Sequence, residues 1–195
     1  MKIMAIVTHP QLEQSRVNRC WLRALEAGGA VTVHNLYERY PDEKINIEVE
    51  QGLLLQHDRL VFQFPVYWYR APYLLLKWFE QVFSYGWAYG PGGRRLQGKE
   101  MLLAASFGGP AESYQAGGYN NYSASELFKP FQATANLVGA RYLAPFLLFG
   151  AVAATDERIE RSAEEYLRHI TDPELDPQVA LSRLLSEMEE SGKTL

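Results

Sequence analysis

The sequence contains only one cysteine, Cys20, among its 195 residues. A disulfide bond within one chain is therefore excluded, and the cysteine content does not favour an oxidising compartment. The N-terminal residues also lack the basic start and the apolar stretch of a signal peptide. On these grounds we expect a cytoplasmic protein.

Long apolar runs are missing as well. The longest one spans residues 142–154, and Pro145 and Gly150 interrupt it. A membrane-spanning helix needs roughly 18 or more apolar residues, so this run is too short to cross a bilayer. The pattern indicates a buried strand.

The chain also lacks an excess of positive charge, because its formal net charge is -4 at pH 7. Binding to nucleic acid requires many contacts from lysine and arginine to phosphates, so we expect no nucleic-acid partner. With 47 % hydrophobic and 22 % charged residues, the composition is that of an ordinary globular protein. We expect no metal site.

Short apolar segments alternate with segments of helical periodicity along the chain. The expected strands are residues 2–7, 30–36, 59–64, 100–107 and 141–149. The expected helices are one that Ser15 or Asn18 caps and Gly28 ends, followed by residues 47–57, 72–84, 125–138, 156–170 and 178–188. This alternation predicts an α/β domain whose five-stranded parallel sheet has helices on both faces.

Two strand orders fit this pattern, a flavodoxin-like order 2-1-3-4-5 and a Rossmann order. In both, the ligand lies beyond the carboxyl ends of the strands, where the direction of winding reverses. The loops that follow strands one, three and four are therefore the candidate site.

The first of these loops, residues 8–18, runs into the start of a helix. Free backbone N–H groups at a helix start favour an anion, and His9, Ser15, Arg16 and Asn18 add side-chain donors. The loop has neither the GxGxxG pattern of a dinucleotide site nor a Walker lysine, so a monophosphate fits better. The alternative is that Ser15 and Asn18 only cap the helix and that His9 is a surface histidine.

The second loop begins with Pro65, Val66, Tyr67 and Trp68, and Tyr69 follows. Three consecutive aromatic side chains between two prolines predict a stiff apolar platform. A flat heteroaromatic ring could lie against such a platform while backbone groups bind its polar edge. The alternative for each ring is packing in the core or in a dimer interface.

The third loop contains Ser106, Phe107, Gly108 and Gly109, and Tyr114 follows five residues later. The two glycines remove side chains where the backbone could approach a ligand closely. Tyr114 could donate a proton to a reduced flavin. Alone, a Gly-Gly-Pro sequence indicates only an ordinary turn. The third loop indicates a ligand site when it is taken together with the first and second loops.

Together these loops resemble the NAD(P)H dehydrogenase (quinone) family, the flavodoxin-like group that includes DT-diaphorase. The resemblance covers roughly residues 1–170, through the THP loop with Ser15 and Asn18, the block at residues 65–93, the LQGK segment and the SFGG loop. Within the family, the segments FSYGWAYGPGGRRLQGK, YPDEKINIEVEQ and FKPFQATANLVG are most similar to ancillary subunits of glutathione-gated potassium efflux (Kef) systems.

This resemblance implies an FMN-dependent NAD(P)H:quinone oxidoreductase that transfers a hydride in a ping-pong mechanism. It implies FMN as cofactor, NADH or NADPH as co-substrate, a quinone-like acceptor and a homodimer with the site at the subunit boundary. By the same resemblance, His9, Ser15 and Asn18 would hold the phosphate, residues 65–68 the isoalloxazine ring and residues 106–109 its polar edge. Tyr114 would be the active-site tyrosine.

One position departs from the family pattern. Related oxidoreductases carry a histidine five or six residues after the tyrosine, where this chain has Tyr119 and Asn120. A phenol with a pKa of about 10 cannot replace imidazole as a proton donor and acceptor near neutral pH, so these two positions do not supply the family's proton source.

An alternative function follows from this departure together with the Kef-like segments. The protein would be a regulatory subunit that associates peripherally with a Kef-type potassium/proton antiporter at the inner face of the cell membrane, and its catalysis would be secondary or lost. A one-electron flavodoxin carrier is a weaker reading, since the net charge is only mildly negative. The expected domains are residues 1–172, which would bind FMN, and a helical extension at residues 173–195.

Overall fold

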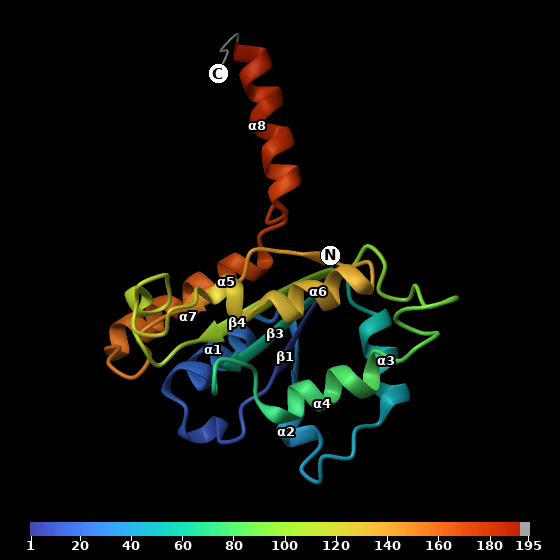
Figure 1. The fold of residues 1–195 in the computed structure, drawn as a ribbon, viewed down its shortest axis with the longest axis horizontal. Coiled ribbons are helices and arrows are strands. Elements are labelled where there is room, and N and C mark those ends of the chain that lie inside the picture. Colours follow the sequence, from blue (N-terminus) through green and yellow to red (C-terminus); the bar gives the residue numbers. More distant parts are fainter. Residues whose placement is uncertain (192–195) are drawn as a thin grey trace.

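The computed structural model describes residues 1–191, and its centre is a twisted parallel sheet (Figure 1). The strands are β1 (Ile3–Val7), β2 (Val31–Asn35), β3 (Arg59–Pro65), β4 (Glu100–Ser106), β5 (Arg141–Tyr142) and β6 (Phe146–Leu148). Their order is β2-β1-β3-β4-β5, and β6 pairs with β4 beyond the end of β5. The flavodoxin-like order is therefore confirmed, and the Rossmann order is excluded.

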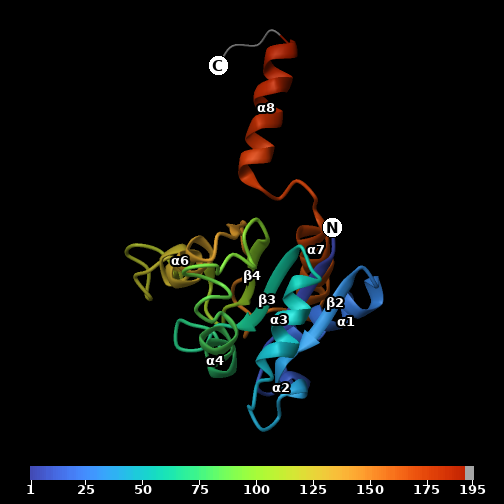
Figure 2. The same cartoon turned by 90° about the vertical axis from the view of Figure 1, so that its right-hand side faces the viewer.

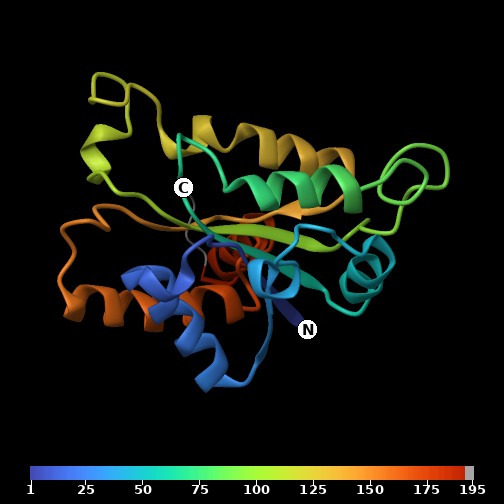
Figure 3. The same cartoon turned by 90° about the horizontal axis from the view of Figure 1, so that it is seen from below.

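Helices cover both faces of the sheet (Figure 3). One face packs against α1 (Arg16–Gly28) and α7 (Asp156–Thr171). The other face packs against α3 (Ile47–Leu55), α4 (Tyr73–Val82) and α6 (Lys129–Leu137). Short helical segments complete the body of the molecule, namely Leu12–Gln14, α2 (Leu36–Arg39), Ala111–Ser113 and α5 (Ala124–Leu127).

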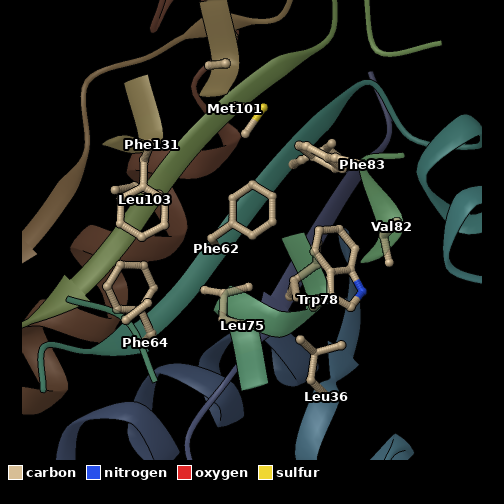
Figure 4. Close-up of a cluster of buried hydrophobic side chains, with 14 of the residues drawn as sticks. Leu36, Phe62, Phe64, Leu75, Trp78, Val82, Phe83, Met101, Leu103 and Phe131 are labelled. Carbon is tan, nitrogen blue, oxygen red and sulfur yellow. The ribbon is translucent and has the colours of Figure 1, made fainter. Parts of the chain in front are cut away.

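Alternation along the strands divides the core into two clusters. On β3, Phe62 and Phe64 point toward α4 and α6, whereas Val61 belongs to the cluster beneath α1 and α7. Figure 4 shows Phe62 and Phe64 beside Trp78 and Phe131 in the first cluster. Because successive side chains of a strand point to opposite faces, a strand buried on both faces reads as a continuous apolar run, as the first, third and fourth strands do.

Two predicted elements are interrupted by proline. The continuous strand predicted at residues 141–149 is wrong, because Pro145 has no N–H to donate to the sheet and separates β5 from β6. The helix predicted at residues 125–138 is divided into α5 and α6, and Pro130 stands in the first turn of α6. Proline is tolerated there because first-turn N–H groups have no helical partner.

A buried carboxylate on α3 joins this helix to β2 and α4. Glu50 on α3 is fully buried and accepts hydrogen bonds from His34 Nε2 (2.9 Å), Tyr40 Oη (2.6 Å) and Trp78 Nε1 (2.7 Å). Each partner comes from a different part of the chain. These hydrogen bonds offset the cost of burying the charge and fix α3 against β2 and α4.

A second buried network lies at the amino edge of the sheet. The guanidinium of Arg59, the first residue of β3, is fully buried and donates to Glu100 Oε2 (2.7 Å) and to the backbone oxygens of Ile170 (2.6 Å) and Asp172 (2.7 Å). Nearby, Arg141 donates to Asp176 at 3.1 Å. These contacts fix the segment that leads out of α7.

Beyond this segment, α8 (Pro177–Ser191) stands clear of the body in both side views (Figures 1 and 2). It extends past the predicted range 178–188, and none of its residues is buried. The domain boundary at residue 172 stays a prediction. Among residues 1–191, no helix is both long and apolar enough to span a bilayer.

Candidate functional site

Three loops meet at the carboxyl edge of the sheet, as the strand order requires, and they enclose a cavity of about 450 Å³. Nine of the predicted site residues line this cavity: His9, Ser15, Arg16, Asn18, Pro65, Val66, Tyr67, Ser106 and Gly108. Gln14, Val17, Ala151 and Val152 complete the lining. The volume is within the range of ordinary ligand pockets, about 300–1,000 Å³.

The first turn of α1 forms the polar end of the cavity. Ser15 is the N-cap, and its Oγ accepts a hydrogen bond from the backbone N–H of Asn18 at 3.1 Å. The backbone N–H groups of Arg16 and Val17 precede any carbonyl partner within the helix. The capping role that the sequence left open for Ser15 is therefore present, and the helix start still offers free donors to an anion.

His9 lies next to this helix start and is almost fully buried. The backbone N–H of Gln11 donates to its Nδ1 at 3.1 Å, so the ring proton is on Nε2. Burial lowers the pKa of His9, which keeps the ring neutral. Its Nε2 lies 3.4 Å from Oη of Tyr67, and it can donate to that oxygen or to a ligand oxygen in the cavity.

Arg16 lines the cavity, but its guanidinium already has protein partners. Its Nη2 donates to the backbone oxygen of Ala154 at 2.8 Å and forms an ion pair with Asp156 at 2.6 Å. Both partners belong to the chain after β6, so Arg16 connects the start of α1 with the start of α7.

The floor of the cavity is a chain of buried hydrogen bonds. Asn18 donates from Nδ2 to Oγ of Ser106 at 3.0 Å, and Gln63 donates from Nε2 to the backbone oxygen of Asn18 at 3.0 Å. These residues connect α1, β4 and β3. The side chain of Asn18 thus orients Ser106, the last residue of β4, at the edge of the cavity.

A second hollow of about 240 Å³ adjoins the cavity and shares Val66 and Gly108 with it. It brings together the predicted residues Trp68, Gly109 and Tyr114, with Tyr69 and Asn120 alongside. The two regions form one continuous surface across the carboxyl ends of β3 and β4.

The aromatic platform is part of a tight turn. Tyr67 and Arg70 exchange both backbone hydrogen bonds, at 2.9 Å and 3.1 Å. The two central residues, Trp68 and Tyr69, have φ angles of 48° and 65°, a region that residues with a Cβ seldom occupy. Trp68 is 87 % exposed and lines the second hollow.

Tyr114 is fixed by aromatic packing at the edge of the second hollow. Its ring lies 4.7 Å from that of Phe107 and 5.5 Å from that of Phe149, centre to centre. Burial raises the pKa of Tyr114 above its ordinary value of 10. The hydroxyl therefore stays protonated and able to donate across the neutral pH range.

Phe107 is the one predicted site residue that lines neither hollow. Its side chain is fully buried, its backbone N–H donates to Leu148, and its backbone oxygen accepts from Ala151. It supports Tyr114 from the core, and nothing of it is free to contact a ligand.

The sequence reasoning missed the cavity wall formed by residues 149–155. The sequence could have indicated this wall, because the carboxyl end of the last parallel strand lies at the same edge of the sheet as the carboxyl ends of the other strands. Gln14 and Val17 in the first loop and Asn120 beside the second hollow were likewise missed, whereas Tyr69 belongs to the predicted aromatic platform. Within residues 1–191, no group of three or more acidic, histidine or cysteine side chains could hold a metal ion.

Comparison with known proteins identifies close relatives. The chain is 53 % identical to the uncharacterized NAD(P)H oxidoreductase YdeQ of Bacillus subtilis, over 97 % of this chain and 96 % of that protein. It is 37 % identical to the potassium-efflux ancillary protein KefG of Cronobacter sakazakii, over 88 % of this chain and 94 % of that protein.

Two solved structures share the fold. General stress protein 14 of Treponema denticola, in complex with FMN, superposes with a TM-score of 0.82 at 42 % identity and covers 86 % of this chain and 96 % of its own. An NADPH-quinone reductase of P. pentosaceus superposes with a TM-score of 0.80 at 32 % identity and covers 88 % of this chain and 99 % of its own. A family model described as a flavodoxin-like fold matches residues 1–170. This chain therefore belongs to the flavodoxin-like family that the model describes.

Proposed function

We propose that this protein is an FMN-dependent NAD(P)H:quinone oxidoreductase. The observation that carries the proposal is the continuous surface at the carboxyl edge, where the cavity with the donor-rich start of α1 adjoins the hollow that Trp68 lines. A ligand with a phosphate at one end and a flat ring at the other fits this arrangement. The FMN complex of the relative from Treponema denticola supports the same ligand.

The residues present fit FMN in three ways. The first turn of α1, with Ser15 and Nε2 of His9, would hold the phosphate. Pro65, Val66 and the Tyr67 backbone would lie along the ring, and Gly108 leaves room for the backbone to approach it. Bound FMN supplies the capacity to accept a hydride from NADH or NADPH and to pass two electrons to a quinone.

In this assignment the Tyr114 hydroxyl would hold a proton near the flavin ring. Its raised pKa keeps that proton in place, and its aromatic neighbours keep the hydroxyl in position. Asn120, which lies beside the same hollow, offers no titrating group, and Tyr119 is 90 % exposed and lines neither hollow. Tyr114 is therefore the proposed proton donor to the acceptor.

We expect Tyr114→Phe to slow quinone reduction by about a hundredfold, the scale of a lost general acid. FMN affinity should stay close to that of the wild type, since the phenyl ring keeps its packing. Stopped-flow measurement of the two half-reactions separates these effects. A loss confined to the reaction with NADPH would contradict the assignment.

A spectrum tests the main proposal directly. The purified protein is supplemented with FMN, desalted and recorded, and NADPH is then added without oxygen. A retained flavin band that bleaches, followed by recovery on addition of a quinone, is the expected result and fits a ping-pong cycle. A protein that keeps no flavin would refute the proposal.

A regulatory role is the second candidate, and the 37 % identity to KefG favours it specifically. In that case the protein would be a cytoplasmic subunit bound peripherally to a Kef-type antiporter. A flavin band that persists with NADPH, together with retention on the detergent-solubilised antiporter at moderate salt, would support this role. We also propose a homodimer with the site at the subunit boundary, which sedimentation analysis can test.

A further inference from the structure

The cavity wall at residues 149–155, here called the β6–α7 loop, is attached to the protein on its inner side by two backbone hydrogen bonds. The N–H of Gly150 donates to the oxygen of Gly109 at 2.7 Å, and the N–H of Ala151 donates to the oxygen of Phe107 at 2.9 Å. Both bonds lead to the loop after β4.

Two arginine side chains also attach the β6–α7 loop: Arg158 donates to the backbone oxygen of Phe149 at 2.8 Å, and Arg16 holds the end of the loop nearest α7. Arg16 donates to the backbone oxygen of Ala154 and pairs with Asp156, the first residue of α7. Arg16 is itself the first residue of α1, so the guanidinium joins the start of α1, which lines the cavity, to the start of α7.

Little else holds the middle of this loop. Val152 lines the cavity but is 81 % exposed, so it gains almost nothing from core packing. Its place depends on the attachments at either end of the loop. Ala154, near the end of the loop, is buried in the core beneath α1 and α7, so removal of the Arg16 contacts should loosen mainly the exposed segment around Val152.

We propose that Arg16 is a positioning residue that holds the β6–α7 loop against α1 and so closes the cofactor cavity, and that it is not the phosphate ligand. This inference rests on the proposed function, because the cavity is taken to be the FMN site. One guanidinium nitrogen already serves both Ala154 and Asp156. A phosphate in the same place would compete with the carboxylate of Asp156 for that charge.

The choice of ligand distinguishes the two roles. Riboflavin has the ring and side chain of FMN without the phosphate. A lost phosphate ligand weakens the binding of FMN alone, whereas a displaced wall weakens the binding of FMN and riboflavin by the same factor.

The experiment measures dissociation constants of both ligands by flavin fluorescence for the wild type, Arg16→Ala, Asp156→Ala and the double variant. We expect Arg16→Ala to weaken both ligands by about tenfold, the scale of a charged hydrogen bond. Asp156→Ala should weaken both by about threefold, as for an exposed ion pair. The double variant should match Arg16→Ala, because the two residues act through one contact.

Arg19→Ala is the matched control, since Arg19 is also on α1 and pairs with Glu13 but lines no cavity. Its ligand affinities should equal those of the wild type. Loss of FMN binding alone in Arg16→Ala, or unchanged or tighter FMN binding in Asp156→Ala, would overturn the proposal.

A measurement on the ligand-free protein keeps the two claims separate. Hydrogen exchange of the peptide that covers the β6–α7 loop should be faster in Arg16→Ala than in Arg19→Ala, without flavin present. Unchanged exchange would refute the positioning role even if FMN binds. A wild-type protein that binds neither flavin would refute the proposed function, while faster exchange would still show that Arg16 holds the loop.

Discussion

Gly109 shows how closely the site backbone passes beneath Tyr114. A Cβ atom built at Gly109 would lie 3.2 Å from Oγ of Ser113 and 3.4 Å from Cε2 of Tyr114. Contacts this short force the neighbours to move by a few tenths of an ångström. The position of the Tyr114 hydroxyl therefore depends on the absence of a side chain here.

We expect Gly109→Ala to lower the rate of quinone reduction by about fivefold or more, because proton transfer is sensitive to small displacements. Gly52→Ala is the control, since a Cβ atom at Gly52 in α3 would meet nothing within 4 Å. Stopped-flow rates and melting temperatures of both variants are compared with the wild type. An equal rate in Gly109→Ala would argue against the placement of Tyr114.

Glu50 makes a prediction about stability. Glu50→Gln places an amide where three donors converge, so at least one of His34, Tyr40 and Trp78 loses its acceptor. We expect a loss of about 2–4 kcal/mol in the free energy of unfolding at pH 7. Urea denaturation measures it, with the exposed Glu48→Gln on the same helix as a control expected to stay within about 0.5 kcal/mol.

The same residue gives a pH dependence. Burial alone raises the pKa of Glu50, but the hydrogen bonds from His34, Tyr40 and Trp78 outweigh burial and hold the pKa below its ordinary value of 4.5. The unfolded chain therefore binds this proton first as the pH falls. The difference in unfolding free energy between the wild type and Glu50→Gln should be constant above about pH 5, where Glu50 is ionised in both states. It should shrink as the pH drops below about 4, because the carboxylate then becomes protonated. A difference that stays constant down to about pH 3 would contradict this prediction.

The residues that lie at the carboxyl edge of the sheet were predictable from the sequence, but their hydrogen-bond partners were not. The sequence indicated Arg16 from its place at a helix start, yet its partners Ala154 and Asp156 lie about 140 residues away in the chain. Phe107 was assigned both to the end of the predicted strand at residues 100–107 and to the loop that follows, and only the three-dimensional packing places its ring in the core.

The turn at residues 67–70 is an element whose sequence opposes its conformation. Type I′ geometry requires positive φ at both central positions, which glycine and asparagine adopt readily and aromatic residues do not. Trp68 and Tyr69 occupy those positions. Strain retained at a ligand surface is consistent with a binding role for the exposed indole.

We therefore expect Trp68→Gly to raise the free energy of unfolding by about 0.5–1 kcal/mol, since the strain is relieved and an 87 % exposed side chain loses little burial. The same variant should weaken flavin binding. Urea denaturation and fluorescence titration test the two effects separately. A destabilised variant would mean that the indole packs more than its exposure indicates.

Among the longer elements, apolar runs and helical periodicity predicted the buried strands and the flanking helices well. The breaks at Pro130 and Pro145 were visible in the sequence, but the strength of the surrounding apolar pattern concealed them. The short helix α2 has only four residues, too few for periodicity to reveal.

For the molecule as a whole, right-handed crossovers reduced the strand order to two candidates, and the resemblance to a flavodoxin-like family favoured the order that the structure has. The arm α8 was predictable as a helix, but its separation from the body was not. Its spacing of Leu181, Leu184, Leu185 and Met188 is that of a helix with a packed face, and no part of residues 1–191 covers that face.

A chain that ends at Asp176 should therefore unfold at the same temperature as the full-length protein, within about 1 °C, because α8 buries no residue and Asp176 keeps its contact with Arg141. Asp176→Ala in the full chain should lower the melting temperature by a few degrees, roughly the effect of a partly buried ion pair. Scanning calorimetry compares the three proteins. A large drop on truncation would show that α8 packs on the body or on a second copy.

The anchoring of α8 also decides how the protein can be attached to a surface. Arg59 and Arg141 fix the base of α8 at the amino ends of β3 and β5, whereas the cavity opens at the carboxyl ends of the strands. A tether or fusion partner joined after α8 would thus leave the molecule from the amino ends of the strands, opposite the carboxyl ends where the cavity lies. Molecules immobilised through this end on an electrode would present the cavity to the solution.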